Sequence, residues 1–285
     1  MKKIFLLFTI IIFNCSVTIF AKPKPKPLVV FVCGDHEYSG EFTLPIIAKE
    51  LETKYGFRTK VLRSYPDQNA EKNIPGLEIL KEADLAVFFL RWRQLEADQL
   101  ALIDDYLKSG KPVMGFRTST HAFNFPKGHP AEQWNAFGEF ALNAPPGWGK
   151  AGHTHYGHKS TTVVYKGPNS KHPIMKGIDP NFSVPSWLYH VLPSYPTKGS
   201  EWLLMGKSIN PDKAAIDNPV AWVGKNSFGA KVFTTTLGHP EDFSVESFQH
   251  LIINASHFLL DKKVPKKWKG KLDINVPYRG MVSSK

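Results

Sequence analysis

Apolar runs alternate with segments of helical periodicity along the first part of the chain. Four runs have the continuous apolar character of buried strands: 28–32, 59–62, 84–90 and a run that begins at Val113. Three segments between them show helical spacing: 45–55, 77–80 and 95–107. This alternation predicts a parallel sheet covered by helices on both faces, with Pro45 in the first turn of the first helix.

The second part of the chain has a different pattern. Residues 122–159 are rich in Gly, Pro, Trp and His and lack a long periodic segment, so we expect an irregular lid or pocket wall there. Five later runs predict strands: 162–165, 186–191, 202–205, 220–223 and 231–237. Few helices separate these runs, and a final amphipathic helix is expected over 248–259. We therefore expect antiparallel strands added to a mostly parallel sheet.

Residues 1–21 have the pattern of a signal peptide. A basic start precedes an apolar run at 4–13, which is too short to span a bilayer, and Ala21 ends a tolerable cleavage site. Lipidation at Cys15 is a poorer interpretation, because Asn14 is bulkier than such sites accept. We expect an exported protein, periplasmic or secreted, with no membrane span after cleavage. Residues 22–27 alternate Lys and Pro and predict an extended spacer.

The chain is basic, with 36 Lys and Arg against 25 Asp and Glu. Much of the excess lies in the spacer and in a tail over 262–285, where we expect solvated lysines. No aromatic platform or recognition helix accompanies this charge, so we expect no nucleic-acid binding. The only cysteines are Cys15 and Cys33, which leaves no disulfide after cleavage. Residues 28–261 are long enough to fold as one domain without such a link.

Three predicted strands end in polar residues. The first is followed by Asp35, His36, Glu37 and Tyr38, the strand at Val113 by 117–121, and the last by 238–242. In an open α/β sheet, ligands bind beyond the carboxyl ends of the strands. We therefore predict one site at this edge, to which Arg117 brings a cation for a carboxylate, phosphate or sugar oxygen.

His239 is a candidate base, because Glu241 stands two residues further on and could orient its ring. The alternative is a histidine that only caps the strand. A His-x-Glu sequence also closes the triad of class I glutamine amidotransferases, which pair it with a cysteine on a strand-to-helix elbow. Here the elbow carries Thr118, Ser119 and Thr120, without the flanking glycines. We therefore expect no glutaminase activity.

Further candidate residues surround this edge. Arg91 and Trp92 follow the third strand, and Tyr189 and His190 lie in a second aromatic cluster; such groups suit sugars but also fill cores. His153 and His155 alternate and could share one face as ligands of a zinc-like divalent metal. Pocket histidines without a metal are the alternative.

With these residues assembled, the chain resembles the ThuA-like (trehalose-utilisation) family from about residue 28 to residue 260. Five segments carry the resemblance: Gly34–Tyr38, Gly115–Phe123, His172–Gly177, Leu188–His190 and Val232–Glu241. The resemblance implies a flavodoxin-like three-layer α/β/α fold similar to class I glutamine amidotransferases, without the nucleophilic cysteine. It also implies a role in the metabolism of disaccharides and their 3-keto forms, with His121 and His239 as pocket histidines and Arg117 and His190 beside them.

Two functions follow from these residues. The first is an enzyme that acts on a sugar or keto-sugar, with His239 as base and with His121, Arg117 or a metal polarising the carbonyl. Hydrolysis through Ser119 or Thr118 is a competing version. The second function is carbohydrate binding without catalysis. The residues expected to bind substrate are His36, Glu37, Arg91, Trp92, Thr118, Ser119, Tyr189 and His190.

Overall fold

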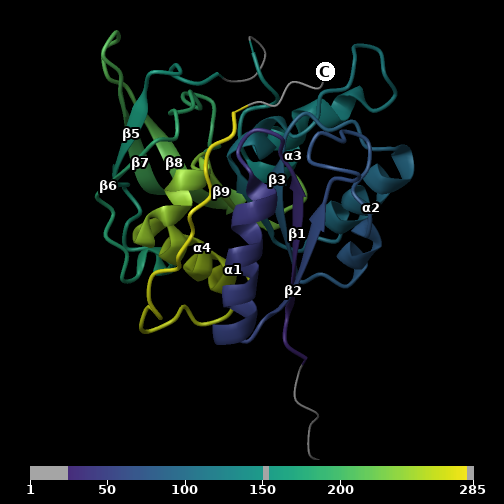
Figure 1. The fold of residues 1–285 in the computed structure, drawn as a ribbon, viewed down its shortest axis with the longest axis horizontal. Coiled ribbons are helices and arrows are strands. Elements are labelled where there is room, and N and C mark those ends of the chain that lie inside the picture. Colours follow the sequence, from purple (N-terminus) through teal and green to yellow (C-terminus); the bar gives the residue numbers. More distant parts are fainter. Residues whose placement is uncertain (1–24, 150–153, 281–285) are drawn as a thin grey trace, which may run out of the picture.

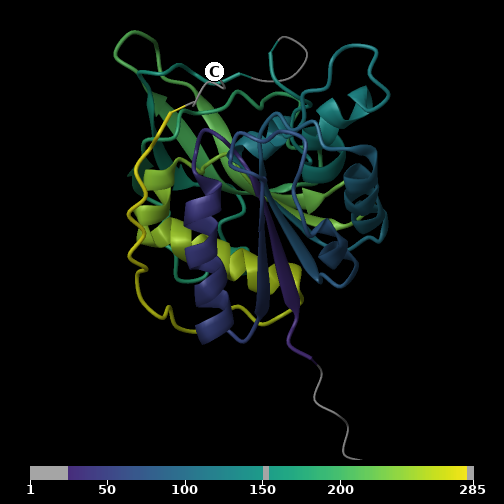
Figure 2. The ribbon, with the colours of Figure 1, turned by 45° about the vertical axis from the view of Figure 1, so that its right-hand side comes forward.

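The computed structural model describes residues 25–149 and 154–280. Within these residues, nine strands form one mixed sheet in the order β2-β1-β3-β4-β9-β8-β7-β5-β6. Helices cover both faces of the parallel part, which gives the three layers visible in Figures 1 and 2. The predicted flavodoxin-like α/β fold is confirmed.

The parallel part contains five strands that pair side by side. They are β1 (Leu28–Gly34), β2 (Arg58–Arg63), β3 (Leu85–Leu90), β4 (Val113–Phe116) and β9 (Lys231–Thr235). β1 and β3 are buried along their whole length, which explains their continuous apolar sequences. Alternate residues of β1 enter two different apolar clusters, one on each face of the sheet.

One face carries α1 (Gly40–Lys54) and α4 (Glu246–Leu259), and their apolar residues join the cluster that contains Phe31. The other face carries the 3₁₀ helix η1 (Leu77–Lys81), α2 (Ala97–Lys108) and the short α3 (Phe137–Leu142). In the described part of the chain, no helix is long and apolar enough to cross a membrane.

The first helix begins earlier than predicted. α1 starts at Gly40, after a left-handed turn at Ser39, so Pro45 lies inside the helix. A proline has no N–H to donate to the carbonyl four residues before it, which here is that of Glu41. The Nε of Arg63 donates to this carbonyl instead, at 3.1 Å. This substitute partner explains how the helix tolerates Pro45.

The antiparallel strands are β5 (Thr161–Lys166), β6 (Phe182–Val184), β7 (Glu201–Ile209) and β8 (Asp217–Lys225). β8 pairs with β9 and continues the sheet through β7 and β5 to β6. The three-residue β6 was not predicted. The strand predicted over 186–191 is wrong, because Tyr189 forms an isolated bridge with His155 and Asn218 Oδ1 accepts the N–H groups of Val191 and Leu192 in a loop.

The segment 122–159 is largely irregular, as expected, although it includes the 3₁₀ helix η3 (Glu132–Ala136) and α3. Residues 150–153 lie outside the described part.

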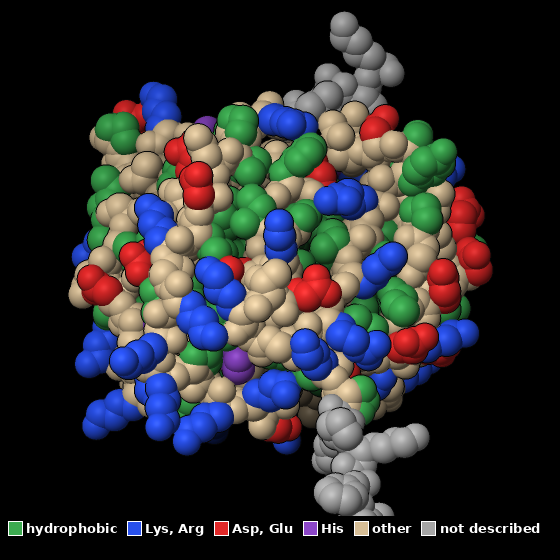
Figure 3. Space-filling view, turned by 60° about the horizontal axis from the view of Figure 1, so that its bottom comes forward, with side chains coloured by type: hydrophobic (Ala, Val, Ile, Leu, Met, Phe, Trp, Pro, Cys, Tyr) green, Lys and Arg blue, Asp and Glu red, His purple; other side chains and the backbone are tan. Residues whose placement is uncertain are grey.

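The last described residues, 262–280, form an extended segment that we call the C-terminal strap. In Figures 1 and 2 it climbs beside α1 from the lower end of the molecule to the upper end, where the parallel strands finish. Its lysines are exposed as expected, and Figure 3 shows Lys and Arg side chains gathered on the lower face. Val264 and Ile274 are buried, however, so the strap packs on the domain.

Candidate functional site

The three polar strand ends come together, and Arg117 connects them. β4 leads directly into the 3₁₀ helix η2 (Arg117–His121). The guanidinium donates to Tyr38 Oη beyond β1, at 3.1 Å, and to the Thr236 carbonyl beyond β9, at 3.0 Å. It also donates to Ser186 Oγ at 3.1 Å and lies over the ring of Tyr189. These contacts place the predicted residues of three strands at one edge of the sheet.

Arg117 occupies the strand-to-helix elbow. Its φ of 38° is left-handed, and the whole residue is buried. A bulky residue rarely adopts this conformation unless surrounding contacts hold it. The strained residue of the elbow is therefore Arg117, one position before the hydroxyl residues 118–120 that the sequence analysis placed there.

Two of the three hydroxyls after Arg117, those of Ser119 and Thr120, donate to backbone carbonyls. Ser119 Oγ donates to the Phe88 carbonyl at 2.8 Å and accepts from the Leu90 N–H at 3.0 Å, so it ties η2 to β3. Thr118 Oγ1 is buried. The Ser119 hydroxyl thus donates its proton to a backbone carbonyl, which argues against a role of Ser119 as a nucleophile.

His239 is the N-cap of the 3₁₀ helix η5 (Pro240–Ser244), and its Nδ1 accepts from the backbone N–H of Glu241 at 3.3 Å. An imidazole nitrogen that accepts has no proton, so the neutral ring carries its proton on Nε2. Burial and the charge of Arg117 lower the pKa of His239 to about 4. The ring is therefore neutral at pH 7 and offers a hydrogen-bond donor from Nε2.

The predicted orientation of His239 by the Glu241 carboxylate is wrong. The Glu241 side chain is exposed, and Nδ1 has no proton to donate to it. The buried acid of this turn is Asp242, whose carboxylate accepts the backbone N–H groups of Gly238 at 2.8 Å and His239 at 3.1 Å. It also accepts from Ser186 Oγ. Asp242 therefore positions the backbone of the turn.

His121 ends η2, next to Thr120. Thr120 Oγ1 donates to the Arg117 carbonyl at 3.0 Å and lies 3.2 Å from His121 Nδ1. Thr120 therefore connects the His121 ring to the backbone of Arg117. The ring packs near Trp148, with 4.7 Å between centroids, and near Trp92.

Charged residues of the loops after β1 and β3 lie beside these histidines. Arg91 Nε pairs with Glu37 at 2.8 Å, and the Arg91 guanidinium stacks on Trp92 at 3.5 Å from the ring centroid. His36 lies between Arg91 and Arg93, which face its two ring nitrogens. Burial and these two cations lower the pKa of His36 to about 3.

The predicted metal ligands are described only in part. His153 lies outside the described residues. His155 accepts from the Gly157 N–H at Nδ1, and its ring packs on His158 and Trp187. Burial and neighbouring positive groups lower the pKa of His155 to about 4. Across 25–149 and 154–280, no group of three His, Cys, Asp or Glu is placed to hold a metal.

The remaining predicted residues divide between core and surface. Tyr189 is buried beneath Arg117. His190 is exposed and stacks on Tyr156, at 5.4 Å between centroids.

Two residues of the site were not predicted from the sequence, Trp148 beside His121 and Tyr278 from the strap. Tyr278, from the strap, lies 4.5 Å from the His239 ring between centroids and donates to Glu37 Oε1 at 3.3 Å. The available signal was the alternation of apolar residues over 272–278, which follows the lysine-rich residues 262–271.

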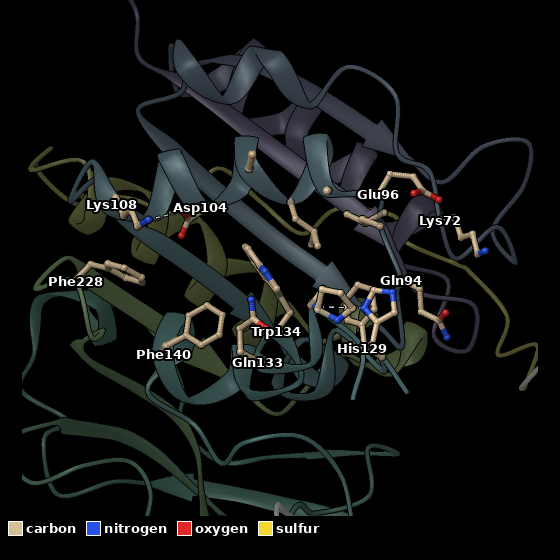
Figure 4. A pocket seen from close by; sticks show the side chains of 17 residues that line it. Lys72, Gln94, Glu96, Asp104, Lys108, His129, Gln133, Trp134, Phe140 and Phe228 are labelled. Carbon is tan, nitrogen blue, oxygen red and sulfur yellow. Dashed lines mark hydrogen bonds and ion pairs between the residues drawn. The ribbon is translucent and has the colours of Figure 1, made fainter. Parts of the chain in front are cut away.

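Two cavities lie near the irregular segment. One of about 340 Å³ opens beside Trp92, His121 and Trp148. A larger one, of about 730 Å³, lies between α2 and α3, and Figure 4 shows Trp134 at its centre with Phe140 and Phe228 on one side. Its lining includes none of the residues at the strand ends, so the smaller cavity is the one that belongs to the site.

The fold and the site define a class of protein: an open, flavodoxin-like α/β domain with an arginine at its elbow and neutral histidines among aromatic rings. The family model for trehalose utilisation (ThuA) matches residues 39–259. Because this match covers most of the chain, the protein belongs to the ThuA family.

Two solved structures of proteins described as ThuA-like share this fold. One, from Parabacteroides merdae ATCC 43184, has a TM-score of 0.62 at 17% sequence identity and covers 90% of this chain and 98% of that chain. Another, from Bacteroides uniformis ATCC 8492, has a TM-score of 0.54 at 19% identity, covering 86% and 95%. No curated protein matches the sequence.

Proposed function

We propose that the protein is an exported enzyme that moves a proton next to the carbonyl group of a keto-sugar, such as a 3-keto-glycoside. The observation that carries this proposal is the neutral His239 ring, which offers Nε2–H as a donor near the buried Arg117 cation. Enolisation of a ketone needs a base for the carbon-bound proton and a donor for the oxygen that becomes negative. His239 can supply the donor, and His121, at the end of η2, is the candidate base.

In this proposal His121 is the base and His239 is the hydrogen-bond donor, which is the reverse of the roles expected from the sequence. The His121 imidazole takes the proton from the carbon beside the carbonyl, and the electrons of that C–H bond form the enediolate. The enediolate oxygen accepts from His239 Nε2–H, in the field of the buried Arg117 cation. Return of the proton to the other carbon isomerises the sugar, whereas expulsion of a glycosidic oxygen completes a lyase reaction.

The surrounding groups suit a sugar. Trp92, which carries Arg91 on its face, and Trp148 offer aromatic surfaces beside His121. Glu37 and Arg91 can pair with hydroxyl groups through charge-assisted hydrogen bonds.

The test follows hydrogen exchange in D₂O by NMR, with 3-keto-glycosides as substrates. The wild-type protein should exchange the hydrogen beside the carbonyl faster than buffer does. His121→Ala should slow this exchange by roughly 10²-fold or more, as loss of a base does. His129→Ala, at the rim of the larger cavity, is the matched control and should leave the rate unchanged. Wild-type exchange at the buffer rate would contradict the proposal.

Carbohydrate binding without catalysis is the second candidate. It is favoured by the elbow, where the strained residue is Arg117 and Ser119 is hydrogen-bonded to the backbone. In that case calorimetry should detect keto-sugar binding to the wild type and to His121→Ala with similar affinity, and no exchange should accompany it.

The export part of the proposal rests on the signal-peptide pattern of residues 1–21. Protein recovered from its own cells should begin near Lys22 by N-terminal sequencing. A zinc-like ion on His153 and His155 stays a prediction, to be tested by metal analysis of the mature wild type and His155→Ala. An equal metal content in the two proteins would exclude His155 as a ligand.

A further inference from the structure

The C-terminal strap is attached to the domain along its length. The side-chain amide of Gln249 in α4 clamps Leu272: its Oε1 accepts the Leu272 N–H at 2.7 Å, and its Nε2 donates to the Leu272 carbonyl at 2.9 Å. Earlier in the strap, Trp268 stacks on His250 of α4, at 4.7 Å between centroids. At the far end, Arg279 lies over the ring of Phe42 in α1.

Between these attachments the strap alternates like a strand. Leu272, Ile274, Val276 and Tyr278 pack toward the main apolar cluster, and the residues between them are exposed. Figures 1 and 2 show the strap rising along α1 to the upper end of the molecule. The alternation therefore brings Tyr278, as the last inward residue, to the edge that carries the site.

Tyr278 touches residues from three separate loops. Its ring stacks on Tyr38 beyond β1, at 5.6 Å and 25°, and lies 4.5 Å from His239 beyond β9. Its edge approaches Trp187 in the loop after β6, at 6.4 Å. Its hydroxyl donates to Glu37 Oε1, while Arg91 Nε holds the other carboxylate oxygen.

We propose that Tyr278 is a positioning residue of the site, which holds the Glu37 carboxylate by its hydroxyl and shields His239 from water by its ring. The C-terminal strap is accordingly part of the site. The kinetic consequence rests on the proposed function, whereas the contacts with Glu37 and His239 do not.

The hydroxyl and the aromatic ring of Tyr278 have different roles, and substitutions can separate them. Burial raises the pKa of the Tyr278 phenol to about 12, so the hydroxyl stays protonated and donates at neutral pH. Tyr278→Phe removes this donor and keeps the ring. Tyr278→Ala removes both, and it opens His239 to solvent.

The matched control is Tyr165→Phe. Tyr165 also donates its hydroxyl to a carboxylate, Asp217 Oδ1 at 2.7 Å, but from β5 in the antiparallel part of the sheet. A general effect of losing a tyrosine–carboxylate bond would appear in both variants.

The first measurement is an NMR titration of the His239 ring, which needs no substrate. In Tyr278→Ala the pKa of His239 should rise from about 4 toward its ordinary value of 6.5, because the ring regains water. In Tyr278→Phe and Tyr165→Phe it should stay near the wild-type value. An unchanged pKa in Tyr278→Ala would overturn the shielding role.

The second measurement is kcat/KM for the keto-sugar as a function of pH. Tyr278→Phe should lose roughly tenfold, the effect of one hydrogen bond to a charged group, while Tyr165→Phe loses nothing. An active wild type with the same rate in Tyr278→Phe would overturn the hydroxyl's role. An inactive wild type in which Tyr278→Ala still raises the His239 pKa would refute the proposed function and support the positioning role.

Discussion

At the scale of single residues, Arg117 shows how the fold supports an unfavourable conformation. A non-glycine residue with left-handed φ costs about 1–2 kcal/mol. Here the guanidinium repays this cost through hydrogen bonds to Tyr38, Ser186 and Thr236, all within 3.1 Å. The same contacts hold the three strand ends together, so the strained residue organises the site.

Replacing Arg117 by alanine and by glycine should separate the cost of its left-handed backbone conformation from the loss of its guanidinium. Arg117→Ala and Arg117→Gly both lose the hydrogen bonds, and each should destabilise the protein by about 1–3 kcal/mol for every buried partner left without its hydrogen bond. Glycine should be no worse than alanine, because it accepts a φ of 38°. At the exposed helical Ala101, substitution by glycine should instead cost about 1 kcal/mol. Chemical denaturation measures all three, and a clear advantage of alanine at position 117 would contradict the strain.

At the scale of elements, the site depends on a segment that has no regular secondary structure of its own. The strap is held to α4 through the side chain of Gln249, which also donates to the Phe243 carbonyl at 2.7 Å. Extended chain without sheet partners exchanges its amides readily unless such contacts protect them. Gln249 therefore controls how firmly Tyr278 is placed.

Gln249→Leu should loosen the strap. It leaves the Leu272 N–H without its acceptor in a partly buried place, at a cost of about 1–3 kcal/mol. Hydrogen exchange followed by mass spectrometry should show faster exchange over residues 272–280, with the parallel strands unaffected. The exposed Gln133→Leu serves as the control. Unchanged protection of the strap would mean that its apolar contacts suffice.

At the scale of the whole molecule, the site places neutral histidines and an acid with a raised pKa in one domain. The pKa values of His36, His155 and His239 are lowered to between about 3 and 4. Burial raises the pKa of Asp35 to about 7. These groups act on stability in opposite directions as the pH changes.

Stability should therefore fall as the medium becomes acidic. Below pH 6.5 the three histidines bind protons in the unfolded chain before they do so in the folded one, so the free energy of unfolding decreases between pH 6.5 and about 4. Asp35 opposes this trend, because its raised folded pKa gives a stabilisation that is lost as the pH rises from 3.8 to about 7. Asp35→Asn should thus steepen the acid-side loss, and His239→Gln should reduce it. Denaturation at pH 7 and pH 5 measures both slopes, and an unaltered slope in His239→Gln would contradict the neutral assignment.

Individual residues show which features of the site could be predicted from the sequence. The polar ends after β1, β4 and β9 were predicted to meet, and Arg117 joins them. The proton arrangement of His239 was not predictable, because it depends on the backbone N–H of Glu241 in a turn held by Asp242. The segment 186–191 has the apolar pattern of a strand, but Asn218 binds its backbone outside the sheet.

The amino-acid pattern alone determined the elements of the parallel half and the edge at which the polar residues collect. Strands buried on both faces need continuous apolar sequences, and parallel strands all finish at the same edge. Only the tertiary structure decided that the elbow residue is a left-handed arginine, which imidazole nitrogen carries a proton, and that Tyr278 completes the site. These features depend on partners that are close in space and distant in the chain. Tyr278 and Glu37 are separated by 241 positions, and a contact over that distance leaves no periodic signal in the sequence.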